Sequence, residues 1–408
     1  MEVLFLMHKP LEGVRVLEWA IFHAGPGAAA ILGDLGAEVI KIEQPEIGDP
    51  LRQTTRYKDI DFHLPGNRNL FFEGSNRGKK GITLNLAVPE GRQIAYNLVS
   101  KCDIFCTNLR QPTIELMRMD YETLSKVNPR LVYASVTGYG PLGPDANEGG
   151  FDYQGQGRSG LMYNIGEPGM PPLAAQFAVI DQSTAIMASY QMVIAFLMRE
   201  RLGIGQKVDV SILGTASYIL YFNNLIALVT GRQIPRHQRA SADPLRNYYK
   251  CKDEKWLVQS QPAEENWGLV CRLLSHPGLE HDPRFATKDK RFQNSKELVL
   301  LFEKIFATRP RDEWLDTFRG KGMIMCAVNT TEEAVKDPQM TANSYIVETE
   351  HPDLGHIRIP GFPARFSHAE TNHVLAAPRL GEHTEEVLRT LGGYSTEEIA
   401  RFRQDKIT

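Results

Sequence analysis

The chain has 408 residues, with 46 lysines and arginines against 49 aspartates and glutamates, and its formal net charge at pH 7 is −3. This balance argues against nucleic-acid binding, which requires a basic face, and the length allows two domains with large cores. The apolar run at residues 3–7 is too short for a signal peptide, and the apolar segment 186–198 is too short to cross a bilayer. We therefore expect a cytoplasmic protein with no nucleic-acid or membrane partner.

The cysteines form no recognisable chemical pattern. They stand at positions 102, 106, 251, 271 and 326, without the even spacing of a disulfide framework and without a second pair to complete a zinc site. The sequence contains no H-E-x-x-H motif and no metal-spaced histidine cluster. We expect reduced, buried thiols and no metal site.

Residues 14–43 form the first unit in chain order. The pattern predicts an apolar strand at 14–17, a turn at 24–27, a helix over 28–35 and a second strand at 39–42. Gly36 lies where a C-cap glycine belongs, and a right-handed crossover makes the two strands parallel. Residues 25–30 match the loose G-x-G-x-x-(G/A) pattern, whose backbone N–H groups suit a pyrophosphate, and Glu43 lies where dinucleotide folds place a ribose-binding acid. A tight turn without a ligand explains the same residues.

Strands and helices continue to alternate after this unit. Residues 45–76, rich in Asp, Arg and Pro, predict a surface excursion. Next come a strand at 82–86, a helix over 89–99 and buried strands at 104–106 and 131–136. This alternation predicts an α/β fold with a mainly parallel sheet.

A segment rich in Gly and Pro, residues 141–172, precedes the longest helix. It contains a formal G-x-G-x-x-G at 155–160, but no strand precedes this motif and prolines block a following helix, so the context of a dinucleotide site fails. Asp181 opens an apolar helix over 182–201 that ends at Gly203. From the residues alone, Asp181 is a helix N-cap, a position that Asp favours strongly.

The second half of the chain predicts a smaller α+β domain. A strand at 207–212 is followed by a polar linker at 233–247, a hairpin of 248–251 with 255–258, and helical patterns to about residue 320. The tail ends in two helices, the second with a capping box formed by Ser395 and Glu398.

Five segments in this order resemble the class III CoA-transferases (CaiB/BaiF-like proteins), the family of formyl-CoA transferase, carnitine CoA-transferase and the α-methylacyl-CoA racemases. They are LEGVRVLEWAIFHAGPGAAAILGDLGAEVIKIEQPEIGDPLR (11–52), SNRGKKGITLNL (75–86), NPRLVYASVTGYGPLGP (128–144), RERLGIGQKVDVSIL (199–213) and APRLGEHTEEVL (377–388). The resemblance covers nearly the whole chain. It implies a large Rossmann-like domain, a smaller domain and an interlocked homodimer, with the large domain at 8–225 (a linker beginning at about 203), the small domain at 226–334 and a return to the large domain at 335–408.

The resemblance also implies a reaction. Members of this family move CoA from an acyl-CoA thioester to a free carboxylic acid, with CoA as a substrate and no tightly bound cofactor. The family's nucleophilic aspartate corresponds to Asp181 in the segment FAVIDQSTA. Its attack on the thioester passes through tetrahedral oxyanions, which need backbone N–H donors such as the glycines at 138, 140 and 155–160.

The CoA site follows by the same resemblance. The turn Phe22-His23-Ala24-Gly25, the strand end at Leu84 and the loop Asn108-Leu109-Arg110 line it, together with the Gly138-Tyr139-Gly140 segment. Arg110 corresponds to a phosphate-contacting lysine of carnitine CoA-transferase, and a guanidinium suits a phosphate through paired donors. The helix after Asp181 and residues 218–224 are candidates for the acyl pocket. Formyl-CoA transferase has an arginine at Gln44, a lysine at Thr137 and a glycine-rich lid at 259–262, and these differences argue against oxalate or formate as substrates.

Three alternatives remain. A racemase or epimerase of the same family has a catalytic histidine before an aspartate, where this chain has Phe151-Asp152, and Phe cannot carry a proton. An NAD-binding oxidoreductase would rest on residues 25–30 and Glu43, but no hydride-transfer site is recognisable. The third is a CoA-binding scaffold without turnover, against which the presence of Asp181 argues.

Overall fold

The computed structural model describes residues 8–260 and 264–408 of the chain. These residues form two compact units. Unit 1 contains the residues up to Met162 together with Ala174–Arg232 and Thr341–Thr408, and unit 2 contains Tyr163–Leu173 and Gln233–Met340. The family resemblance implied a smaller domain at 226–334, and the short segment Tyr163–Leu173 was outside that prediction.

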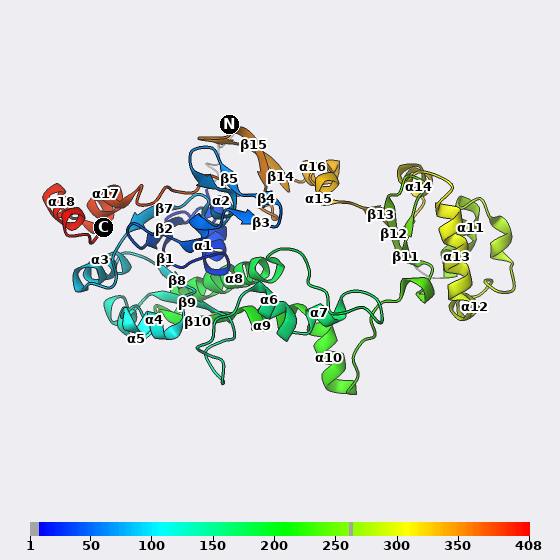
Figure 1. The fold of residues 1–408 in the computed structure, drawn as a ribbon, viewed down its shortest axis with the longest axis horizontal. Helices are drawn as coiled ribbons and strands as arrows, with labels where there is room; N and C mark the ends of the chain where they lie inside the picture. The colour runs from blue at the N-terminus through cyan, green and yellow to red at the C-terminus, as the bar shows by residue number, and fades with distance from the viewer. Residues whose placement is uncertain (1–7, 261–263) are drawn as a thin grey trace. The chain divides into compact units, whose positions relative to one another are not determined.

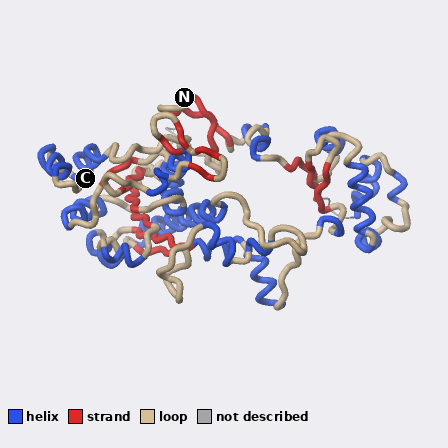
Figure 2. The backbone as a smooth tube through the Cα atoms, viewed as in Figure 1, coloured by secondary structure: helices blue, strands red, loops and turns tan. Residues whose placement is uncertain are grey.

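Unit 1 is built on a six-stranded parallel sheet (Figures 1 and 2). Its strands are β1 (Arg15–Trp19), β2 (Glu38–Glu43), β7 (Lys80–Thr83), β8 (Ile104–Thr107), β9 (Val132–Thr137) and β10 (Gln206–Ser211). Their order across the sheet is β7-β2-β1-β8-β9-β10, which is the 3-2-1-4-5-6 order of dinucleotide-binding folds. The predicted α/β class with a parallel sheet is therefore confirmed, and the order reverses between β1 and β8.

Both faces of the sheet are covered by helices. Successive strand residues point to opposite faces, and because both sets are apolar, each face is buried under helices. Leu17, Phe105 and Tyr133 belong to one core, against which α3 (Pro89–Val99) and the C-terminal α18 (Thr396–Gln404) pack. Val16, Ile104 and Val132 belong to the other, under α1 (Ala24–Asp34) and α8 (Val179–Leu202). The C-terminal residues thus complete the same core that the N-terminal strands begin.

The remaining elements of unit 1 are short. They are η1 (Pro50–Gln53), β3 (Arg56–Tyr57), β4 (Ile60–Asp61), β5 (His63–Leu64), β6 (Arg68–Asn69), α2 (Leu70–Asn76), α4 (Gln111–Leu116), α5 (Tyr121–Val127), α6 (Asp152–Arg158), the start of α7 (Leu161–Asn164, which continues into unit 2), α9 (Ile212–Ile219), α10 (Tyr221–Thr230), β14 (Ile346–His351), β15 (Gly355–Pro360), α17 (Thr384–Val387) and the π-helical η5 (Leu388–Gly392). The predicted surface excursion at 45–76 therefore carries local structure, and Leu51 and Phe72 within it are buried.

Unit 2 packs helices against a three-stranded antiparallel sheet. Its elements are η2 (Arg239–Ser241), β11 (Arg246–Lys250), β12 (Trp256–Ser260), η3 (Glu264–Asn266), α11 (Trp267–Leu273), η4 (Pro277–Glu280), α12 (Lys288–Gln293), α13 (Ser295–Phe306), α14 (Arg311–Phe318), β13 (Met325–Val328), α15 (Thr331–Ala334) and the start of α16 (Pro338–Ala342, which ends in unit 1). Pairing of Lys250 with Trp256 confirms the predicted hairpin. Aromatic side chains, including the fully buried Trp314, dominate the core.

One local prediction is wrong. The turn predicted at 24–27 is the first turn of α1, because Pro26 needs no hydrogen-bonded N–H there. The formal G-x-G-x-x-G at 155–160 lies mostly within α6 and forms no phosphate-binding turn, as its sequence context predicted. The capping box is confirmed, since Ser395 Oγ accepts from Glu398 N–H and Glu398 accepts from Ser395 N–H.

The cysteines and the apolar helices complete the description. All five cysteines are unpaired, and four are buried while Cys326 is exposed, which corrects the expectation that all are buried. Within residues 8–260 and 264–408, no single helix is long and apolar enough to span a membrane, and only α9 with α10, bent by 76°, passes that test as a pair. The apolar run at 3–7 lies outside the described residues.

Candidate active site

A cavity of about 330 Å³ lies where the strand order of the sheet reverses. Residues 21–24 follow β1, residues 108–110 follow β8 and Gly138 follows β9, and all of them line the cavity. Asp181, near the start of α8, completes it. Ligands of open α/β sheets bind at this position, outside the carboxyl ends of the strands.

The backbone between β1 and α1 is held by two side chains from other parts of unit 1. Asn108 accepts a hydrogen bond from Ile21 N–H at 2.9 Å and donates one to Ile21 O at 2.7 Å. Phe22 has a left-handed backbone, with φ of 60°, and its N–H donates to Asp49 Oδ1 at 3.2 Å. The chain therefore enters α1 along one defined path, which orients His23.

Asp181 is the third residue of α8, and it is not the N-cap, so that prediction is wrong. The N-cap is Ala178, whose φ is 54°. Asp152 of α6 accepts hydrogen bonds from the N–H groups of Ile180 (2.6 Å) and Asp181 (3.2 Å), and Gln156 donates to its other oxygen. Because another carboxylate caps the helix, the side chain of Asp181 is left for another role.

The carboxyl group of Asp181 has an unusual environment. Burial, and secondarily the charge of Asp152, raise its pKa to about 7. Its Oδ1 atom is buried and has no hydrogen-bond partner among the described residues. A buried, unpaired carboxylate oxygen destabilises the fold, so it indicates a functional group held ready for a reactant.

His23 is held as a neutral side chain beside this group. Burial lowers the pKa of the imidazole. Its Nε2 lies 2.7 Å from Gln182 Oε1 and its Nδ1 lies 2.8 Å from Ser75 Oγ. Because the Gln182 carbonyl can only accept, Nε2 carries the proton and Nδ1 accepts from the Ser75 hydroxyl. His23 is therefore an uncharged wall of the cavity, unsuited to pairing with a phosphate.

The structure brings most of the predicted residues together. Phe22, His23, Ala24, Asn108, Leu109, Arg110 and Gly138 line the cavity with Asp181. Among the predicted CoA-binding residues, Gly25, Leu84, Tyr139 and Gly140 are not part of this lining. Leu84 is buried in the core, and the Gly140 N–H donates to Thr137 Oγ1 at 3.0 Å. The Gly155 N–H donates to Phe151 O within α6, so neither amide is free for an oxyanion.

The sequence did not predict the loop between β9 and α6, which forms part of the cavity wall. Its lining residues are Ala146, Glu148, Gly149, Gly150 and Phe151, and Ile21, Thr113, Thr137 and Ile212 add to the wall. A Cβ atom on Gly138 would lie 2.8 Å from Gly150 Cα, so both positions require glycine for the two chains to approach. The paired glycines at 149–150 were the available signal. The segment at 259–262, for which the resemblance implied a difference from the lid of formyl-CoA transferase, lies partly outside the described residues.

The dinucleotide-type acid has a structural role instead. The carboxylate of Glu43 is occupied by Arg52, whose Nε and Nη2 donate to its two oxygens at 2.8 and 2.7 Å. The ammonium of Lys79, directly before β7, also has a structural role, because it is buried against Glu18 and the Pro26 carbonyl. Within the described parts of the chain, no group of three His, Cys, Asp or Glu side chains could hold a metal ion.

Comparisons with known proteins agree over nearly the whole chain. The family model described as CoA-transferase family III matches residues 11–384. A succinyl-CoA:glutarate CoA-transferase of Mus musculus is 32% identical, over 97% of this chain and 89% of that protein. A cinnamoyl-CoA:phenyllactate CoA-transferase of Clostridium sporogenes is 31% identical, over 97% and 96%. The crystal structure of a CAIB/BAIF family protein from Brucella suis superimposes with a TM-score of 0.85 at 30% identity, covering 94% of this chain and 100% of that one.

Proposed function

The chain belongs to CoA-transferase family III, and we propose that the carboxylate of Asp181 is the group that carries CoA between the two acids. The enzyme transfers CoA from an acyl-CoA thioester to a free carboxylic acid. The observation that carries the proposal is the buried Oδ1 atom of Asp181, which lacks a partner among the described residues and lines the cavity at the strand-order reversal.

The proposed reaction consists of four acyl transfers at one carboxylate. The Asp181 carboxylate attacks the donor thioester carbonyl, the C–S bond breaks, and a mixed anhydride and CoA thiolate result. The thiolate attacks the aspartyl carbonyl, which releases the donor acid and leaves an aspartyl-CoA thioester. The acceptor carboxylate attacks that thioester and forms a second anhydride with release of the thiolate. The thiolate then attacks the acyl carbonyl of the acceptor, giving the new acyl-CoA and regenerating Asp181.

The environment of Asp181 suits this role in two ways. A carboxylate whose conjugate acid has a pKa of about 7 is a better nucleophile than an ordinary exposed one, because the attacking oxygen is poorly solvated and more basic. The bonds from Asp152 to the first turn of α8 keep the backbone of Asp181 in place while its side chain changes from carboxylate to anhydride to thioester. Asp152 thus acts as a positioning residue.

The cavity supports a CoA site at the same place. The start of α1 offers backbone N–H groups, which suit a pyrophosphate. Arg110 is exposed at the cavity, and its guanidinium suits a phosphate. Phe22, Ala24, Asn108 and Leu109 provide the remaining predicted contacts with CoA, and His23 contributes an uncharged surface.

We also propose that the enzyme is an interlocked homodimer, as the family resemblance implies. Helix α10 supports this proposal, because Phe222, Leu228 and Val229 are 72%, 85% and 75% exposed. Apolar side chains gathered on one helix are typical of an interface. A Phe222→Glu, Leu228→Glu double variant should be monomeric by light scattering, and a monomeric wild-type protein would contradict the proposal.

Mass spectrometry of the peptide that contains Asp181 tests the catalytic proposal. After incubation with a panel of acyl-CoAs, we expect CoA bound to Asp181 through a linkage that hydroxylamine cleaves. Asp181→Asn should give neither adduct nor turnover. As a control, Asp145→Asn removes a carboxylate that pairs with Arg158 and should react normally. Full turnover by Asp181→Ala would reject the proposed nucleophile.

The racemase alternative is distinguished by proton exchange. Phe151 occupies the place of the required histidine, and its ring packs edge-on against Phe22 at 5.5 Å. We expect no deuterium incorporation from D₂O at the α-carbon of a 2-methylacyl-CoA under conditions where CoA transfer proceeds. Incorporation as fast as transfer would favour a racemase.

A further inference from the structure

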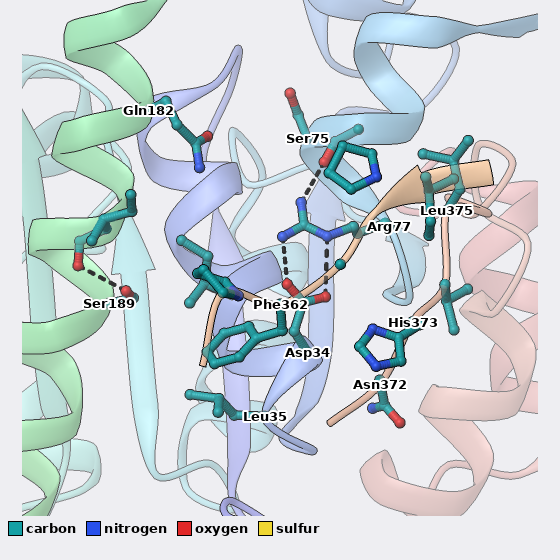
Figure 3. A pocket seen from close by; sticks show the side chains of 18 of the residues that line it. Asp34, Leu35, Ser75, Arg77, Gln182, Ser189, Phe362, Asn372, His373 and Leu375 are labelled. Carbon is teal, nitrogen blue, oxygen red and sulfur yellow. Dashed lines mark hydrogen bonds and ion pairs between the residues drawn. The ribbon is translucent and has the colours of Figure 1, made fainter. Parts of the chain in front are cut away.

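A second, larger cavity lies beside the candidate active site and shares His23 with it. Its volume is about 630 Å³, within the range of about 300–1,000 Å³ that is usual for small-molecule sites. Gln182, the residue after Asp181, also lines this cavity, as Figure 3 shows. Asp181 lines the first cavity and Gln182 lines the second, so neighbouring residues in the first turn of α8 face the two cavities.

One face of α8 forms the long wall of this cavity. Gln182, Ile186, Tyr190 and Val193 line it, and their spacing of three or four residues places them on one side of the helix. At a rise of about 1.5 Å per residue, the eleven steps from Gln182 to Val193 span about 16 Å. The wall thus extends away from Asp181 over a distance that is long enough for an extended acyl chain.

The other walls are mainly apolar. They are formed by Ile31 and Leu35 of α1, Leu70 and Phe71 of α2, and Phe362 and Leu375 of the returning C-terminal segment. The ring of Phe71 also packs against His23 at 5.8 Å between centroids. Segments far apart in the sequence therefore build one apolar chamber.

The charges at this cavity are already paired. Arg77 is the only arginine or lysine among its described lining residues. Its Nε donates to Asp34 Oδ1 at 3.0 Å, its Nη2 donates to Asp34 Oδ2, and its Nη1 donates to Gly74 O (Figure 3). The positive charge of Arg77 is therefore balanced by the Asp34 carboxylate, and His23 is neutral. A second carboxylate in this cavity would find no unpaired arginine or lysine among the described residues of the wall.

We propose that this cavity holds the acyl group during transfer, and that the enzyme acts on apolar monocarboxylic acids in preference to dicarboxylic acids. The inference rests on the proposed function of Asp181, because it places the acyl group relative to that carboxylate. Burial of each additional methylene should raise the rate constant of acylation about fourfold until the cavity is filled. A terminal carboxylate should lower it by about 100-fold or more, because no unpaired arginine or lysine among the described residues of the wall would neutralise that buried charge.

Labelling of Asp181 by hexanoyl-CoA and by adipoyl-CoA provides a matched test. The two acyl chains have the same length and differ only in a terminal methyl or carboxylate group. We expect hexanoyl-CoA to form the Asp181–CoA adduct at least 100-fold faster. Equal or faster labelling by adipoyl-CoA would overturn the inference and leave the proposed nucleophile intact, whereas failure of every donor to label Asp181 would reject the proposed function itself.

Val193→Trp tests where the acyl chain lies, since the larger ring fills the far end of the cavity. We expect the ratio of hexanoyl-CoA to propionyl-CoA labelling rates to fall at least tenfold. Leu197→Trp is the matched control, because Leu197 is one turn further along α8, is 55% exposed and does not line the cavity. An unchanged ratio in Val193→Trp would overturn the inference, whether or not that variant weakens self-association.

Discussion

Asp152→Asn should move the pH dependence of Asp181 acylation toward acid. The substitution removes the charge of Asp152 but keeps Oδ1 as an acceptor for Ile180 N–H and Asp181 N–H. The pKa of Asp181 is raised from 3.8 to about 7, with burial as the larger cause and Asp152 as the smaller. Removal of the smaller cause should therefore lower the pKa, but burial keeps it above its ordinary value.

The effect on rate follows from the ionised fraction of the nucleophile. With a pKa of about 7, roughly one tenth of the Asp181 side chains are ionised at pH 6. If the pKa falls by about one unit, roughly half would be ionised at the same pH. The rate at pH 6, relative to the plateau at high pH, should then rise about fivefold in Asp152→Asn.

Single-turnover labelling of Asp181 between pH 5 and pH 9 measures this shift directly. Asp145→Asn is the control, because its carboxylate pairs with Arg158 and is not a cause of the raised pKa. The amide introduced by Asp152→Asn faces the Gln156 amide, so thermal unfolding should be recorded in parallel to confirm folding. If the acid limb of the pH–rate profile stays in place or moves to higher pH, Asp152 is not a cause of the raised pKa of Asp181.

Three further predictions follow from the same contacts. Asp181→Asn should raise the free energy of unfolding by up to about 4 kcal/mol above pH 7 and by little near pH 4. The reason is that the folded-state pKa of Asp181 is raised, so the stability of the wild-type protein falls as the pH rises from 3.8 to about 7. Urea unfolding at both pH values measures the difference. Arg110→Ala should raise KM for acyl-CoA about tenfold, because a charged contact to phosphate is lost. The control Arg201→Ala, on the exposed end of α8, should leave steady-state kinetics unchanged. Equal KM values for Arg110→Ala and the wild-type enzyme would exclude Arg110 from the site. Glu18→Gln should destabilise unit 1 by about 3–5 kcal/mol, because the buried ammonium groups of Lys41 and Lys79 both donate to Glu18, and an unchanged urea midpoint would show that this cluster is dispensable.

Local structure was predictable where neighbouring residues determine it. The helix predicted over 89–99 is α3 (Pro89–Val99), because Pro89 suits a first helical turn and the apolar spacing creates one buried face. Gly36 and Gly203 end their helices with φ of 100° and 79°, a conformation that glycine adopts without strain. The resemblance to a family predicted the reaction and the role of Asp181 as its nucleophile. No local pattern distinguishes Asp181 from a capping residue.

The tertiary structure decided which residues meet. The strand order brings the ends of β1, β8 and β9 to one edge, so residues more than 100 positions apart line one cavity with Asp181. Asp152 takes over the capping of α8, and Asp34 neutralises Arg77 across 43 positions of sequence. Burial, pairing and unpaired oxygens depend on these long-range contacts, whereas a sequence pattern reports only the preferences of residues close together in the chain.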